Sequence, residues 1–271
     1  MSEKKKQNSP EVVTKPFLTG SITDENTIKN AFKFFGIMLL IIFMSFIVCS
    51  LTSFENNLLR IALNVMIVSL VLIILYNKGT KPGTDAVARG EILYQRQENG
   101  QDVTSGERRL SYHPMKGYLN AFLGTLPFLI PAVIYAFSAE KTTTSFGTLP
   151  DWVGSMINRS EIGDALVSYT NPAGLTSTDF LRMFVRIFIM PFVSMAGSTN
   201  REGLLLVERL SPLILLLPGI AYGSGYLNGK RIRTRIHTEI EENKKKKKRR
   251  DLREQRARRE ASAPKEPEQL N

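Results

Sequence analysis

Four charged side chains lie in or beside apolar stretches of the sequence, where charge could do chemistry: Arg182, Arg186, Glu208 and Arg209. Charge within a membrane is costly, and it often marks an ion or substrate site. Arg182 and Arg186 are four residues apart, so a helix would place them on one face. Arg186 and Glu208 could pair if their two segments form a hairpin. We predict an interfacial ion pair that fixes this hairpin, and an ion or substrate site is the alternative.

A second group of charges that could bind a partner is a dense cluster of cations near the C-terminus. Residues 230–260 contain 15 Lys or Arg and 6 Asp or Glu, and they carry most of the net charge of +11. The unbroken run consists of Lys244, Lys245, Lys246, Lys247, Lys248, Arg249 and Arg250. Such a cluster suits the phosphates of anionic lipid or of RNA. A solvated tail that only enforces topology is the alternative.

Motifs for the common catalytic chemistries are missing from the sequence. It has no P-loop, no nucleotide-binding glycine fingerprint, no zincin motif and no nucleophile elbow. His113 and His237 are the only histidines, and Cys49, the single cysteine, is in an apolar segment far from both. We therefore predict no metal site, no cofactor and no enzymatic activity.

The elements that must position these charges are apolar segments long enough to cross a bilayer. Segments 34–54, 117–139 and 210–229 carry no charge, and segment 58–76 carries only Arg60, near its start. At about 1.5 Å per residue, some 20 helical residues cross the roughly 30 Å of hydrocarbon. The short connection at 55–57 makes residues 34–77 a transmembrane helical hairpin.

The two long polar loops differ in charge, and this difference predicts the topology. Loop 78–116 is basic, whereas loop 140–179 is acidic. Lys and Arg are retained on the cytoplasmic side, so the first loop and the tail at 230–271 are expected inside and the second loop outside. Segment 180–229 must then cross once, with a re-entrant or interfacial helix over 180–196 before the last span. We predict an all-α polytopic membrane bundle of four spans with both termini cytoplasmic, and five spans is the alternative.

The polar ends are predicted to lie outside this bundle as disordered termini. Residues 1–33 form a cytoplasmic N-terminal segment whose first twenty residues are expected to be disordered. The C-terminal tail from Glu239 onward is rich in Glu, Lys and Arg, and it could project as a charged helix rather than join a core.

Turn and helix-breaking residues predict finer features of the loops. Lys81-Pro82-Gly83 indicates a turn, followed by a separate short helix over 85–98 that ends at Asn99-Gly100. In the acidic loop, Trp152 suggests an interfacial helix, and 158–160 match a glycosylation sequon.

Proline and glycine residues within the apolar segments predict how the helices pack. Pro127 and Pro131 favour a kinked third span, with a broken helix that lines a pathway as the alternative. Gly219 and Gly223 have the small-xxx-small spacing of a helix-packing face.

These features together predict a non-enzymatic integral membrane interaction or assembly protein. Its expected partners are membrane lipids, a membrane protein or a second copy of the chain, and RNA or the ribosome through the tail. The alternative is a small transporter or permease subunit with proline-broken helices. Short loops and polar ends favour a bacterial plasma membrane.

Overall fold

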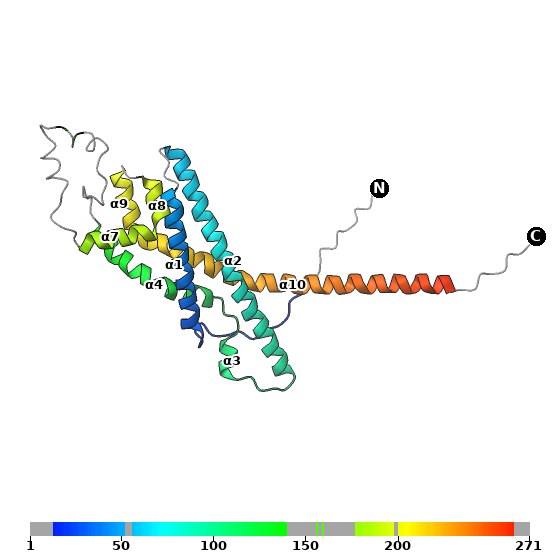
Figure 1. The fold of residues 1–271 in the computed structure, drawn as a ribbon. Coiled ribbons are helices and arrows are strands. Elements are labelled where there is room, and N and C mark those ends of the chain that lie inside the picture. The colour runs from blue at the N-terminus through cyan, green and yellow to red at the C-terminus, as the bar shows by residue number, and fades with distance from the viewer. Residues whose placement is uncertain are drawn as a thin grey trace, which may run out of the picture.

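The computed structural model describes residues 13–51, 56–139, 177–197 and 200–262, together with the isolated residues 156 and 159. In this part of the chain the regular structure is entirely helical, as Figure 1 shows. The helices are α1 (Thr27–Leu51), α2 (Asn57–Glu98), α3 (Ser105–Arg109), α4 (Lys116–Ser138), α7 (Ser177–Phe188), α8 (Met190–Ala196), α9 (Arg201–Arg209) and α10 (Ser211–Ser262). The prediction of an all-α fold is confirmed.

Three helices are long and apolar enough to cross a membrane: α1, α2 and α4. Helices α9 and α10 supply a fourth candidate if the pair, which is bent by 54°, is counted as one span. Helices α7 and α8 have 12 and 7 residues, too few to cross the hydrocarbon. The chain is therefore a helical membrane protein with three or four candidate spans.

Much of the apolar surface of these helices faces outward. Only 28% of the most apolar window of α1 and 11% of that of α2 is buried within the chain. Phe43 and Ile73, for example, are exposed by 63% and 56%. Exposed apolar area on this scale would promote aggregation in water, whereas it matches the hydrocarbon of a bilayer.

Helix α2 runs without interruption through Pro82, so the predicted turn and the separate helix over 85–98 are wrong. Two threonines help to satisfy carbonyls near the proline: Thr80 Oγ1 donates to Asn77 O at 2.8 Å, and Thr84 Oγ1 donates to Lys81 O at 2.7 Å. Pro82 lacks the amide that would donate to Lys78 O, and these two hydroxyls reinforce the turns on either side of it. The predicted end of the helix is confirmed, because Asn99 is the C-cap and Gly100 has a φ of 72°.

Close packing against α10 explains why this helix continues past the apolar span. A Cβ at Gly79 or Gly83 would collide with the backbone of Tyr222 or Tyr226. On α10, Gly225 meets the backbone of α2 in the same way. Backbones this close gain dense van der Waals contact that a local turn would forfeit.

Prolines are likewise accommodated inside α4 and α10, which remain single helices. The predicted packing role of Gly219 and Gly223 is confirmed, because both face α4. A Cβ at Gly219 would lie 3.6 Å from that of Ala121, and one at Gly223 would collide with the ring of Tyr118.

The described part of the N-terminal segment, residues 13–20, lies along α2 and α10 rather than being disordered as predicted. Val13 N donates to Thr238 Oγ1 at 3.1 Å, and Leu18 N donates to Gly90 O at 3.1 Å. The ring of Phe17 packs edge-on against Tyr112. The disorder prediction failed here because the backbone partners come from distant parts of the chain. At the other end, α10 continues as a helix to Ser262, so the prediction of a disordered C-terminal end is wrong for residues 230–262, whereas the charged helix from Glu239 onward is confirmed.

Predictions for residues 1–12, for the tail beyond 262 and for most of the acidic loop lie outside the described residues. Those for Trp152 and for the sequon fall in this last part.

Candidate functional site

A buried carboxylate, Glu208 at the end of α9, is the centre of a charged network. Its side chain is 2% exposed. Arg186 of α7 approaches Oε1 with Nε at 2.7 Å and Nη2 at 2.6 Å. Tyr135 of α4 donates its hydroxyl to Oε2 at 2.7 Å, and Arg182 Nε donates to the same hydroxyl. The network, here called the Glu208 cluster, joins three helices.

The structure thus brings together three of the four charges singled out from the sequence. Arg182 is 2% exposed, and its Nε also lies 3.8 Å from Glu208 Oε1. Arg209 stays apart, because it is exposed and its Nη2 is 3.5 Å from Ala139 O. Both oxygens of Glu208 are occupied by protein donors. This geometry favours the ion pair that fixes the segments over an ion or substrate site.

Tyr135 is the member of the Glu208 cluster that the sequence analysis missed. It lies within an apolar helix, and its ring is fully buried. A buried tyrosine hydroxyl generally needs a polar partner, so its position in a charge-free segment was the available signal.

The cations of the C-terminal run lie on the exposed part of α10. Lys244, Lys246 and Arg250 form local ion pairs with acidic residues one turn away on the same helix. Lys244 is 3.1 Å from Glu241, and Arg250 is 2.9 Å from Glu254. The side chains of these two cations are 68% and 81% exposed. Such pairs contribute little to stability, so the cations stay accessible to a partner.

The base of this tail is fixed by Glu91 of α2, a buried carboxylate that the sequence analysis placed in a separate loop helix. Arg233 donates to its Oε2 from Nε at 3.0 Å and from Nη2 at 2.8 Å. His237 Nε2 lies 2.8 Å from the other oxygen. The beginning of the basic segment is therefore clamped to α2, whereas the run at 244–250 lies beyond the clamp.

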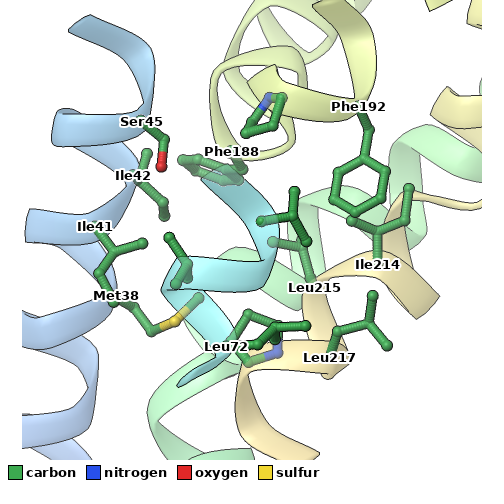
Figure 2. Close-up of a pocket in the computed structure, with 14 residues that line it drawn as sticks. Met38, Ile41, Ile42, Ser45, Leu72, Phe188, Phe192, Ile214, Leu215 and Leu217 are labelled. Atoms are coloured by element: carbon green, nitrogen blue, oxygen red, sulfur yellow. The ribbon is translucent and has the colours of Figure 1, made fainter. Parts of the chain in front are cut away.

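A small cavity of about 60 Å³ lies between α1, α2, α8 and α10. Figure 2 shows its apolar walls, including Met38, Phe188 and Leu215, with Ser45 as the polar side chain at one side. Walls of this kind can hold hydrocarbon, but they offer few hydrogen bonds to a polar substrate.

Comparison of the chain with protein-family models, with curated proteins and with solved structures found no match. Within the described ranges, no group of three or more His, Cys, Asp or Glu side chains is placed to hold a metal ion.

Proposed function

We propose that this protein is a non-enzymatic membrane interaction or assembly protein whose basic C-terminal helix binds RNA, as on a ribosome. The observation that carries the proposal is the continuity of α10. One helix starts in the apolar bundle and extends as a basic rod away from the other helices, as Figure 1 shows.

Helix geometry favours a soluble polyanion over the lipid of the same bilayer. Gly229 ends the charge-free part of α10, and Lys244 and Arg259 follow 15 and 30 residues later. At about 1.5 Å per residue they lie about 22 Å and 45 Å farther along the axis. If α10 is tilted by roughly 40° from the bilayer normal, Lys244 still lies about 17 Å above the membrane surface. This height is about twice the Debye length of about 8 Å. Attraction to the headgroups is strongly screened at that height.

The proposed orientation places this rod in the cytoplasm of a bacterial cell. Basic residues are concentrated in the 78–116 loop and the tail, and these segments are retained inside. Four spans with α7 and α8 at the outer interface bring both ends to that side. A reporter fused after Asn271 is expected to score as cytoplasmic, and an extracytoplasmic signal would reject this arrangement.

The experiment compares the full-length protein in nanodiscs with two variants of equal charge. One variant replaces Lys245, Lys246, Lys247, Lys248 and Arg249 by Gln. The control replaces five exposed cations elsewhere by Gln: Lys15, Lys78, Lys81, Arg108 and Arg109. Binding of a fluorescent ribosomal RNA fragment is titrated at several salt concentrations.

The tail variant is expected to bind this RNA more than tenfold more weakly and to lose several units of salt slope, because each phosphate contact contributes about 0.7–0.9. The control is expected to bind as the wild type does. Equal RNA binding by all three proteins would overturn the proposal. Binding to vesicles that contain 30% phosphatidylglycerol is measured for the same proteins. A tail variant that loses binding to these vesicles but still binds RNA would also overturn the proposal, because lipid would then be the partner.

The alternative, a small transporter or permease subunit, depended on helices broken at proline. Helices α4 and α10 run through Pro127, Pro131 and Pro218 as single helices, so this support is weaker. Solute flux into proteoliposomes that persists without residues 244–259 would favour the transporter.

A further inference from the structure

A polar pocket of about 380 Å³ opens between α1, α2, α4 and α10 at the end of the bundle from which the tail extends. We call it the Asn120 pocket. Residues that flank the charge-free segments line it: Lys33 directly precedes segment 34–54, and Lys116 directly precedes segment 117–139. The pocket therefore lies where the hydrocarbon gives way to the polar phase.

The buried wall of the pocket holds a polar group without a partner. Asn120 is 4% exposed, and its Oδ1 accepts no hydrogen bond. Because the oxygen and nitrogen of an amide are assigned from their partners, this side chain can present either an acceptor or a donor to a ligand. An unpaired buried amide is costly, and a bound polar ligand would remove that cost.

Charge in the pocket is positive after its internal pair is set aside. Lys116 is buried and uses its ammonium on Asp24 Oδ2 at 3.1 Å and on the carbonyls of Arg109 and Ser111 at 2.7 and 2.8 Å. This neutralises Asp24.

Three exposed cations, Lys29, Lys33 and Arg89, face a single remaining carboxylate, Asp85. In the described structure none of these four groups forms an ion pair. The lining therefore carries a net charge of +2 and has cations available to an anion.

The surface beside the pocket is apolar. Ile28 and Phe32, one turn apart on α1, are 81% and 73% exposed and alternate in sequence with the two lysines of the rim. A ligand that carries both an anionic group and hydrocarbon would match both surfaces. Basic pockets between helices at the cytoplasmic surface bind phosphorylated lipid headgroups in this way.

We propose that the Asn120 pocket binds a phosphate group and that its source is the headgroup of an anionic phospholipid. Lys29, Lys33 and Arg89 contact the phosphate, and Asn120 hydrogen-bonds to the headgroup. The acyl chains leave the pocket past Phe32 toward the charge-free segment 34–54. This site is independent of the C-terminal run and does not rest on the proposed RNA binding.

The test uses the full-length protein, delipidated in mild detergent, and titrates it with dioctanoyl-phosphatidylglycerol, with dioctanoyl-phosphatidylcholine and with inorganic phosphate. The pocket variant carries Lys29→Gln, Lys33→Gln and Arg89→Gln, all at exposed positions. The matched control removes the same charge from the tail with Lys246→Gln, Lys247→Gln and Lys248→Gln.

Phosphatidylglycerol is expected to bind the wild type and the tail control equally and the pocket variant more than tenfold more weakly, with phosphatidylcholine weaker throughout. Equal binding of phosphatidylglycerol to the pocket variant and the wild type would overturn the site. Inorganic phosphate that binds as tightly as phosphatidylglycerol would overturn the lipid as the source. An Asn120→Asp variant, which adds a negative charge at the wall, is expected to bind phosphatidylglycerol more weakly than the wild type does.

Discussion

The two ends of α4 carry polar clusters of opposite character. Tyr135 belongs to the Glu208 cluster, whereas Lys116 and Asn120 line the Asn120 pocket, about 28 Å and about 22 Å away along the same helix. In the Glu208 cluster no buried polar atom of Tyr135, Arg182 or Glu208 lacks a hydrogen-bond partner. At the other end of α4, Asn120 Oδ1 lacks a hydrogen-bond partner. The three cations on the rim of the pocket, Lys29, Lys33 and Arg89, have no counter-ion in the described residues.

The comparison shows that charged residues near the membrane can have either of two roles: they can join helices, or they can bind a ligand. A buried carboxylate whose oxygens are all occupied has no capacity left for a ligand, and it joins helices. A cluster that is positive, open and only partly satisfied retains that capacity. Residue type is similar in the two clusters, so the number of unused donors and acceptors distinguishes them.

The largest effect is expected from removing the carboxylate of the Glu208 cluster. Glu208→Leu removes the carboxylate that Arg182 and Arg186 share, and Arg182 is only 2% exposed. The change is expected to cost about 3–5 kcal/mol of stability. Denaturant or thermal unfolding in detergent measures the loss. Glu239→Leu, which breaks the exposed pair with Arg235, is the matched control and is expected to leave the midpoint unchanged. Equal midpoints for both variants would contradict the structural role of the Glu208 cluster.

The packing that closes the pocket end is tested by a pair of glycine substitutions. Gly83→Ala places a Cβ against the backbone of Tyr226 and is expected to cost about 1–3 kcal/mol. Gly36→Ala on α1 meets no atom within 4 Å and is expected to stabilise the helix by about 0.5–1 kcal/mol. Unfolding midpoints measure both variants. Shifts of the same sign would show that the close contact of α2 with α10 does not stabilise the bundle.

The smallest loss of stability is expected at the ion pair inside the pocket, and it should be coupled to binding. Asp24→Asn exchanges a charged acceptor of Lys116 for a neutral one and is expected to cost about 1 kcal/mol. It also raises the net charge of the lining by one, so phosphatidylglycerol should bind several-fold more tightly. Titration with this lipid measures the gain. Weaker binding would mean that Asp24 itself orders the binding groups.

Much of the candidate site followed from local sequence. Arg186 and Glu208 were expected to pair because two opposite charges beside apolar segments gain most when they meet. The exposed cation run followed from composition alone. Tyr135, Glu91 and Asn120 did not follow, because each has a role only through residues far away in the chain. A single polar residue in a helix can signal that a partner is needed, but it does not identify that partner.

The sequence by itself determined where the membrane helices lie and where the charge is concentrated. Hydrocarbon rejects charge residue by residue, so a local count of apolar residues is sufficient for that purpose. Only the tertiary structure decided that α2 continues through Pro82, that residues 13–20 lie along α2 and α10, and that one end of α4 is closed by ion pairs while the other opens into a pocket. These outcomes depend on which backbones approach closely enough to pack and which polar atoms find partners, and both are properties of pairs of distant segments.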